Sequence, residues 1–250
     1  PQDKRISAAL AALGPSYIKL GQFLATRGDI IGPELQGDLA LLQDRMEPFG
    51  MDEARRAVEA ALGGKLEDHF VEFGPAVAAA SIAQVHKAVV IDNGERRTVA
   101  VKILRPGIER RFRRDLDSYF FAAHLVERWH EPSRRLRPVA VVENLARTTE
   151  LEMDLRLEAA AMSEMAENLG PDEGFRVPRV DWRRTAKRVL VTEWIDGIPI
   201  GDKAALKSAG YDIDALGMTV IRSFLKHAMR DGFFHADMHQ GNLFVDKAGT

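Results

Sequence analysis

The fold is decided by the stretch Phe234-His235-Ala236-Asp237-Met238-His239-Gln240-Gly241-Asn242-Leu243-Phe244-Val245. An Asp and an Asn stand five residues apart in it, after a predicted helix and before a short apolar strand. The spacing of Asp237 and Asn242 is typical of a phosphotransferase catalytic loop, in which the Asp accepts the acceptor's proton and the Asn binds Mg²⁺. Because His-x-Asp runs also occur by chance, this interpretation needs a second motif.

That second motif is Val99-Ala100-Val101-Lys102, an apolar strand that ends in a lysine. It is similar to the Val-Ala-Ile-Lys of the third strand in kinases, whose lysine contacts the α- and β-phosphates of ATP. The alternative for Lys102 is a solvated lysine at the end of a strand. Two motifs in the kinase order, at a domain-sized separation, predict ATP chemistry.

The composition sets the class of protein. The chain has 250 residues, of which 46% are hydrophobic and 29% charged, as in ordinary globular proteins. It has no cysteine, which excludes disulfides and thiolate metal sites and fits a cytosolic environment. The net charge of -2 argues against general nucleic-acid binding. No apolar run approaches the roughly 18 residues that span a bilayer.

Periodicity and turn residues predict helices first and strands afterwards. Ser16 is a predicted N-cap for a helix over Tyr17 to Ala25. Further helices are expected over Pro33 to Leu42 and Met51 to Leu62. From Phe70 the pattern is that of strands, and Asn93-Gly94 predicts a hairpin between two of them.

The second half is predicted to be mostly helical. We expect helices over 106–129, 138–169, 203–208 and 213–230, and strands over 177–180 and 188–194. These elements predict an α+β, bilobal, protein-kinase-like fold. Its expected parts are a helical N-terminal extension (1–69), a kinase-like N-lobe with inserted helices (70–195) and the start of a helical C-lobe (196–250). No Asp-Phe-Gly is present, so we expect the C-lobe to be cut after the catalytic loop and the metal-binding Asp to lie beyond Thr250.

The segment before the lysine strand is rich in alanine where kinases have a glycine-rich loop. Pro75 to Val85 contains Ala78-Ala79-Ala80-Ser81 and no glycine. Alanine does not readily reach the positive φ angles that glycine allows, so a stiffer phosphate loop is expected. The alternative is an alanine-rich entry into a strand.

Four motifs in one order carry a family resemblance: Lys19-Leu20-Gly21-Gln22, Ala78-Ala79-Ala80-Ser81, Glu152-Met153-Asp154 and His235-Ala236-Asp237. With them the whole chain resembles the UbiB/ADCK family of atypical kinases. The Lys-x-Gly-Gln element is absent from ordinary kinases. The resemblance implies an ATP- or ADP-binding, Mg²⁺-dependent ATPase or kinase that supports ubiquinone biosynthesis.

The resemblance also implies roles for particular residues. Lys19 and Gln22 would belong to a helical cover over the active site, and Lys19 would be buried against Glu152 and Asp154. Glu158 would be the partner of Lys102, with Glu164 and Glu167 as rivals on the same helix. From spacing alone, a solvated Lys19 on an ordinary amphipathic helix is an equal alternative.

The expected nucleotide site combines the alanine segment with a hinge. The backbone carbonyl of Glu193 and the N–H of Ile195 would face adenine, although a plain strand followed by a turn is the alternative. The complete expected set is Val77, Ala78, Ala79, Ala80, Ser81, Ile82, Ala83, Gln84, Val85, Lys102, Glu193 and Ile195.

Two other clusters have simpler interpretations. Arg105, Arg110, Arg111, Arg113 and Arg114 crowd one predicted helix start. Such a run is usually a solvated face, and its alternative is contact with anionic lipid headgroups. His235 and His239 lie four residues apart, but no further metal ligands accompany them.

The resemblance further implies a place of action and partners. These are the cytoplasmic face of the inner membrane, a lipid or quinone-precursor ligand and other quinone-biosynthesis proteins. Two alternatives stay open: a small-molecule kinase of the aminoglycoside phosphotransferase type, and a catalytically idle nucleotide-binding scaffold. The Lys-x-Gly-Gln helix argues against the first, because an open acceptor site should lack a cover.

Overall fold

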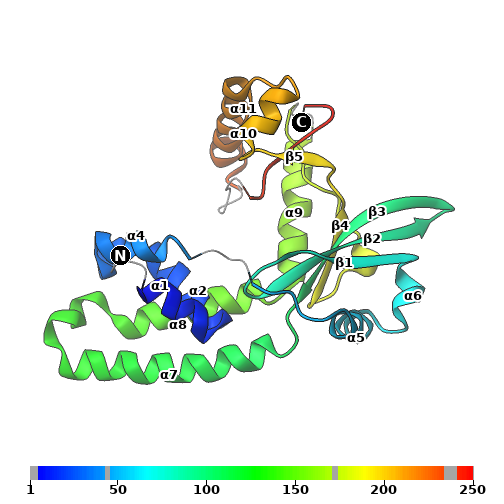
Figure 1. The fold of residues 1–250 in the computed structure, drawn as a ribbon. Coiled ribbons are helices and arrows are strands. Elements are labelled where there is room, and N and C mark those ends of the chain that lie inside the picture. The colour runs from blue at the N-terminus through cyan, green and yellow to red at the C-terminus, as the bar shows by residue number, and fades with distance from the viewer. Residues whose placement is uncertain (1–4, 43–45, 171–173, 234–240, 250) are drawn as a thin grey trace.

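The computed structural model describes residues 5–42, 46–170, 174–233 and 241–249, and its helices and strands confirm the α+β class (Figure 1). The helices are α1 (Arg5–Leu13), α2 (Pro15–Ala25), α3 (Gly28–Ile31), α4 (Pro33–Leu39), α5 (Met51–Leu62), α6 (Leu66–His69), α7 (Ile108–Trp129), α8 (Pro138–Glu152), α9 (Leu155–Leu169), α10 (Lys203–Ser208) and α11 (Ile213–Lys226). The strands are β1 (Glu72–Ala79), β2 (Ala83–Asp92), β3 (Glu95–Leu104), β4 (Val189–Glu193), β5 (Gly197–Pro199) and β6 (Phe244–Asp246).

The main sheet is antiparallel, with the strand order β1-β2-β3-β4. Its centre is the predicted hairpin, in which Asn93 and Gly94 both take positive φ angles of 52° and 83°. These are the angles that a two-residue turn between twisted strands requires. The turn fixes the register, so that Val85 pairs with Lys102.

Each face of the sheet packs against helices. Val90, Val99 and Val101 are fully buried on one face, against Ala54 and Val58 of α5. The other face packs against the start of α7 and the start of α9. Because β-strand side chains alternate between faces, Lys102 lies on this second face, between Val101 and Ile103 of the first.

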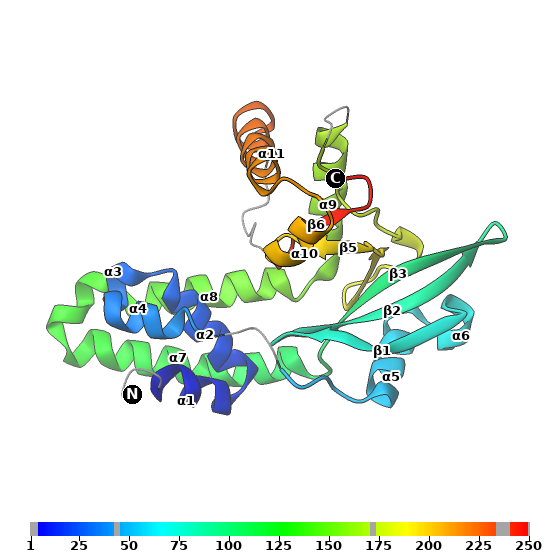
Figure 2. The ribbon, with the colours of Figure 1, turned by 45° about the horizontal axis from the view of Figure 1, so that its top comes forward.

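The inserted helices α7 and α8 run side by side, joined by a 3₁₀ turn over Glu131–Leu136 (Figures 1 and 2). The N-terminal helices α1, α2 and α4 lie on this pair. Tyr17, Leu20 and Phe23 of α2 pack against a buried cluster that includes Tyr119 and Leu145. The rings of Tyr17 and Tyr119 meet edge to face at 5.3 Å.

One predicted helix is two helices. The expected helix over 138–169 breaks at Met153–Asp154, which we call the corner, and α9 leaves in a different direction from α8 (Figure 1). At the corner the Asp154 carboxylate accepts a hydrogen bond from the N–H of Arg156 at 3.1 Å and so caps α9. The prediction of one continuous helix over 138–169 is therefore wrong at this point.

Smaller differences follow from local chemistry. Gly14, with φ 110°, stands at the N-cap of α2 in place of Ser16, which is fully buried. The helix after Pro33 ends at Leu39, and 177–180 contributes one isolated bridge, between Val180 and Thr192. The predicted helices over 51–62 and 203–208 are confirmed to the residue.

A buried arginine ties the tip of the β2–β3 hairpin to the segment before β4. Arg184 donates to Asp92 at 3.0 Å and to Asp181 at 2.7 Å, while Arg97 also pairs with Asp92. The Arg184 and Arg97 guanidinium groups lower the pKa of Asp92 from its ordinary 3.8 to about 2. The carboxylate is therefore held in its charged form.

We expect this network to make stability depend on acid. Because the pKa of Asp92 is lower in the folded chain, its contribution to the free energy of unfolding is complete above about pH 4 and is lost as pH falls toward 2. Asp92→Asn should lower the free energy of unfolding at pH 6, and the gap from the parent should close between pH 4 and 2. Urea unfolding across this range measures the gap. A gap that stays constant with pH would contradict the charged network.

Candidate active site

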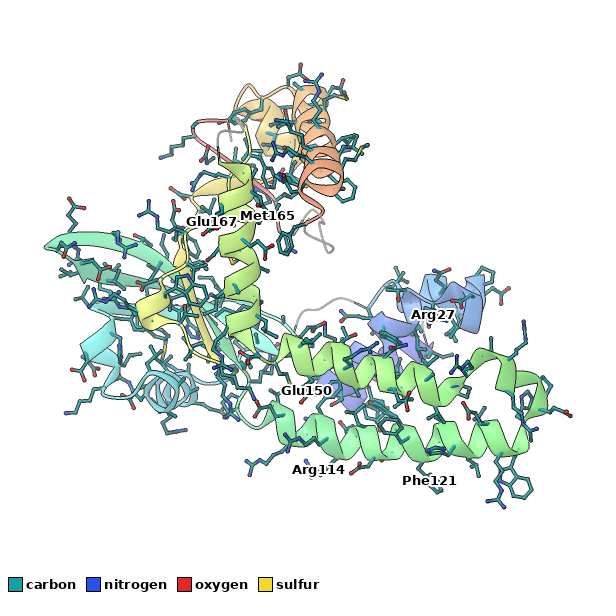
Figure 3. The ribbon with its side chains drawn as sticks, turned by 180° about the vertical axis from the view of Figure 1, so that it is seen from behind. Arg27, Arg114, Phe121, Glu150, Met165 and Glu167 are labelled. Carbon is teal, nitrogen blue, oxygen red and sulfur yellow. The ribbon has the colours of Figure 1, made fainter. Side chains whose placement is uncertain are left out.

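Lys102 of β3 and Glu158 of α9 form an ion pair. The Lys102 ammonium donates to both carboxylate oxygens, at 2.9 and 2.8 Å. The two side chains are 33% and 42% exposed, so a ligand can reach the pair. The rivals Glu164 and Glu167 are exposed, and Glu167 lies toward the far end of α9 (Figure 3).

The strands around Lys102 define one row of side chains across the sheet. Val85 pairs with Ala78 on one side and with Lys102 on the other, and Lys102 pairs with Leu190 of β4. Directly paired residues of an antiparallel sheet point to the same face. The alanine segment and the lysine therefore border one surface of the sheet, which is the surface expected to hold the nucleotide.

The predicted alanine loop is mostly strand, which was the alternative interpretation. Val77, Ala78 and Ala79 lie in β1, and Ala83, Gln84 and Val85 lie in β2. Only residues 80–82 form the turn, closed by the Ala80 N–H to the Ala83 carbonyl at 2.7 Å. Asn93 and Arg137 are the non-glycine residues with positive φ in the described ranges, so the alanines need no glycine-like angle.

Several side chains of this segment point into the protein. Ser81 is fully buried and Ile82 is 8% exposed. The Gln84 amide oxygen accepts from the N–H of Phe49 at 2.8 Å, and its nitrogen lies 2.7 Å from a ring nitrogen of His86. These bonds occupy the Gln84 side chain. The side chain thus has a packing role, and the nucleotide contact expected of Gln84 stays a prediction.

An arginine that the sequence placed in a solvated or lipid-binding run instead connects the alanine turn to the N-terminal extension. Arg105, directly after β3, donates to the carbonyl of Ala80 at 3.0 Å and to that of Glu47 at 2.8 Å. The N–H of Met46 also donates to the carbonyl of Ala79 at 3.1 Å. The linker after α4 is therefore bonded to the turn. The sequence showed only that Arg105 follows the lysine strand and belongs to an arginine run.

The expected hinge lies beside the strand that follows the expected catalytic loop. β5 pairs with β6 through Ile198 and Val245. A Cβ on Gly197 would lie 2.8 Å from the Val245 carbonyl oxygen, so only glycine permits this approach. Arg176, missed from the sequence, links the Glu193 carboxylate at 3.0 Å to Asp246 at 3.1 Å.

The expected adenine contacts of the Glu193 carbonyl and the Ile195 N–H stay predictions. The Glu193 N–H donates to the carbonyl of Arg179 at 2.8 Å, and its carboxylate is held by Arg176. The N–H of Ile195 makes no hydrogen bond to the described residues, so it remains available to a ligand.

The catalytic loop itself falls mainly on residues 234–240, outside the described residues, including His235, Asp237 and His239. Asn242 is described: its side chain is exposed, two residues before β6. The helical turn that leads into the loop is anchored by Arg230, which donates to the Asn168 carbonyl at 3.0 Å. Arg230 and His227 lower the pKa of Asp231 to about 2. Within the described ranges no three His, Asp or Glu side chains group as a metal site.

One ion pair predicted for the cover helix is present, with two corrections, while its place over the active site stays a prediction. The Lys19 ammonium of α2 lies 2.6 Å from the Glu152 carboxylate at the end of α8. Asp154 pairs instead with Arg156, at 2.6 Å, because it caps α9. Lys19 and Glu152 are 20% and 35% exposed, so the pair is partly exposed and not buried as expected.

The glycine of the Lys-x-Gly-Gln motif has a packing reason. A Cβ on Gly21 would lie 2.2 Å from a methyl group of Leu42 and 3.0 Å from one of Leu10. Gln22 is partly buried and makes no hydrogen bond to other described residues. Gly21 thus lets α2 approach α1 and the end of α4 closely.

A family model described as the ABC1 atypical kinase-like domain matches residues 41–250. This chain belongs to that family. The membership confirms the resemblance to UbiB/ADCK proteins that its motifs predicted, and it accounts for the kinase-like arrangement of β3, α9 and the hinge in this ABC1 chain.

Relatives of this ABC1 chain are named "Probable protein kinase UbiB". The one from Marinobacter nauticus is 43% identical over 98% of this chain and 46% of its own length. The one from Xanthomonas campestris pv. campestris is 43% identical over 97% of this chain and 44% of its own length. The ABC1 chain thus spans about half the length of these curated relatives.

A solved structure shares the fold. The complex of Rv3197 with erythromycin from Mycobacterium tuberculosis is 28% identical to the ABC1 chain, with a TM-score of 0.62, and the match covers 96% of this chain and 60% of that one. In the part of the ABC1 chain that the structure describes, no helix has both the length and the apolarity to cross a bilayer.

The partial exposure of the Lys19–Glu152 pair predicts how much the pair contributes to the free energy of unfolding. A partly exposed ion pair contributes about 1 kcal/mol or less, whereas breaking a buried one costs about 3–5 kcal/mol. We expect Lys19→Met to lower the free energy of unfolding by about 1 kcal/mol or less and to raise hydrogen exchange in α2. A double-mutant cycle with Glu152→Gln isolates the pair. A loss of 3 kcal/mol or more would show that Lys19 is buried in solution.

Proposed function

We propose that this chain is the nucleotide-binding part of an atypical kinase or ATPase that supports ubiquinone biosynthesis at a membrane surface. The observation that carries the proposal is the Lys102–Glu158 ion pair in a chain of the ABC1 kinase-like family. A lysine on the third strand paired with a helix glutamate is the arrangement that kinases use to hold the α- and β-phosphates.

Each residue of the pair has a distinct task in this proposal. Lys102 binds the phosphates, because its side chain is partly exposed and only Glu158 holds it among the described residues. Glu158 orients Lys102 and keeps it extended toward the cleft. The half-exposed state of both side chains supports this role, since a buried pair could not exchange its partner for a phosphate.

In this proposal, Asp237 and Asn242 of the catalytic loop carry out phosphoryl transfer. Asp237 takes the proton from the attacking hydroxyl or water, and Asn242 supplies an amide oxygen, a ligand type that suits Mg²⁺. The exposed position of Asn242 before β6 fits that task. The metal ion would neutralise the charge of the β- and γ-phosphates. The N–H of Ile195, which lacks a partner among the described residues, would meet the adenine edge.

The pathway part of the proposal rests on the family. The UbiB/ADCK resemblance implies work at the cytoplasmic face of the inner membrane, with a lipid or quinone precursor as ligand and other quinone-biosynthesis proteins as partners. A bound nucleotide and Mg²⁺ are the cofactors that the kinase-like domain implies.

One observation favours a second candidate, a small-molecule kinase of the aminoglycoside phosphotransferase type. The relative of known structure was solved as a complex with erythromycin, so a protein of this fold holds a bulky small molecule. The Lys19–Glu152 contact argues for the first candidate, because it fixes α2 to the end of α8, next to the corner from which α9 starts.

We expect substitutions of the pair to abolish chemistry selectively. In the full-length protein, Lys102→Met and Glu158→Gln should each lower ATP turnover roughly 100-fold or more, the loss typical of a removed charge-stabilising group. Asp237→Asn should abolish turnover while nucleotide affinity stays largely intact. ATP hydrolysis and nucleotide titration measure the two effects.

Matched controls lie on the same helix. Glu164→Gln and Glu167→Gln remove the same charge from exposed positions of α9 and should leave turnover unchanged. Equal turnover in the parent and the Asp237→Asn protein would reject the catalytic assignment. Equal losses at all three glutamates would reject the specific role of Glu158.

The pathway part has its own test. ATP turnover by the full-length protein should rise when vesicles with anionic lipid and a quinone precursor are added together. An aminoglycoside or macrolide offered as acceptor should give no stimulation. The second candidate would be favoured if such a small molecule raised ATP turnover and became phosphorylated while the lipids had no effect.

A further inference from the structure

The arginines around the start of α7 fall into two groups. Arg105 and Arg111 are used inside the protein: Arg105 binds the alanine turn, and Arg111 donates to the carbonyl of Leu13 at 2.9 Å. Arg110, Arg113 and Arg114 are exposed, and none makes a hydrogen bond or ion pair to another described residue. The second group therefore has no role in holding the described part of the fold together.

The phase of α7 places these free arginines opposite its buried side. Tyr119 and Ala123 are buried against α2 and α8, and Phe112 is buried against the corner between α8 and α9. With 3.6 residues per turn, Arg114 and Phe121 lie together on the opposite side. Figure 3 shows both of them on the side of α7 that faces away from α8.

That opposite side also exposes large apolar side chains. Phe121 is 73% exposed, Trp129 74% and Leu125 48%. Single exposed apolar residues are common, but three on one side of one helix, beside unpaired arginines, form an unusual surface. One acidic residue, Asp117, lies among them. We define the outer face of α7 by Arg110, Arg113, Arg114, Phe121, Leu125 and Trp129.

A basic cavity adjoins the N-terminal end of this face. It has a volume of about 640 Å³ and lies between α5, the start of α7 and the segment before β4. One of its lining side chains, Glu53, is acidic, whereas five are basic: Arg56, Arg105, Arg110, Lys187 and Arg188. Arg110 belongs to both the cavity and the outer face, so the two form one continuous surface.

We infer that the outer face of α7 and the basic cavity dock on an anionic lipid bilayer. The cavity and the free arginines bind phosphate groups of the lipids, while Phe121, Leu125 and Trp129 enter the boundary between headgroups and acyl chains. α7 then lies parallel to the membrane, as interfacial amphipathic helices do. The inference rests on the proposed function at a membrane surface and names the surface of this chain that would serve it.

Charge and apolarity together favour this occupant. The chain as a whole has a net charge of -2, so a general attraction to anions is absent and the positive charge is local. A basic surface with interleaved aromatic and aliphatic side chains matches the two layers of an anionic membrane interface. A bilayer would contact all six residues of the outer face at once, the three arginines through its phosphates and the three apolar side chains through its acyl boundary.

The binding of lipid phosphates by the basic residues is tested by sedimenting this chain with vesicles. It should bind vesicles of phosphatidylglycerol and phosphatidylcholine, bind pure phosphatidylcholine far more weakly, and release as salt is raised. Each basic residue near such a surface contributes about fivefold, so the triple variant Arg110→Gln/Arg113→Gln/Arg114→Gln should bind on the order of 100-fold more weakly. The control Arg96→Gln/Arg147→Gln/Arg222→Gln removes the same charge from β3, α8 and α11 and should bind nearly as the parent does.

The insertion of the apolar side chains into the bilayer can be measured by tryptophan fluorescence. Brominated lipids should quench the parent's tryptophan fluorescence, and Trp129→Phe should remove most of the quenching while vesicle binding persists. Phe121→Ser should weaken binding at least several-fold. Met229→Ser, at an 84% exposed residue after α11, is the matched control and should have no effect. Thermal melting establishes that each variant is folded.

Several outcomes would overturn the inference. These are equal binding to phosphatidylcholine vesicles, equal losses in the two triple variants, or a Trp129 that brominated lipid does not quench. A dimer that forms without lipid and is lost in Phe121→Ser would assign the face to a second copy of the chain instead. Vesicle binding is measured without nucleotide, and Lys102→Met should retain it. A failure of docking is thus distinct from a failure of the proposed enzyme activity.

Discussion

The buried cluster around the corner between α8 and α9 is the constraint on which the rest of the structure depends. Met153 of the corner packs there with Ile82 of the alanine turn and with Phe112 of α7. The ends of β3 and β4 contribute Leu104 and Leu190 to the same cluster. The sheet, the inserted helices and α9 therefore meet at one apolar point, and a shift of any one of them is opposed by the others.

The corner also separates two acidic residues that serve different parts of the molecule. Glu152, the last residue of α8, pairs with Lys19 of the N-terminal extension. Glu158, one turn into α9, pairs with Lys102 of the sheet. In a continuous helix, the six-residue spacing would direct these side chains to different sides of one rod. The break gives each its own helix and lets both contacts form.

Local signals explain which parts of the fold could be predicted. The Asn93-Gly94 turn and the helix over 51–62 are specified by residues within a few positions, so the sequence alone reveals them. The corner is not specified in this way. Besides the Asp154 cap, it depends on the Leu155 N–H, which donates to the carbonyl of Lys187 at 2.9 Å. A bond between residues so far apart in the sequence leaves no periodic trace.

The same distinction holds for the candidate site. The strand lysine and the spacing of the catalytic loop are short motifs, and the family resemblance singled out Glu158 from its neighbours Glu164 and Glu167. The roles of Arg105 and Arg176 could not be predicted, because Arg105 binds backbone carbonyls and Arg176 joins Glu193 to Asp246, which lies 70 residues after the arginine. Backbone acceptors exist at every position, so a sequence gives no sign of which one a side chain will choose.

The bonds between the linker and the alanine turn connect the N-terminal extension to the proposed nucleotide site. The carbonyls of Ala79 and Ala80 cannot reorient without losing Met46 and Arg105 as donors. A nucleotide that moved this turn would therefore also change the hydrogen bonds between the turn and the extension. Thermodynamic linkage then requires reciprocity: a ligand bound to the extension changes nucleotide affinity by the same factor by which nucleotide changes the affinity for that ligand. Any coupling of this kind would pass through the peptide carbonyls of Ala79 and Ala80.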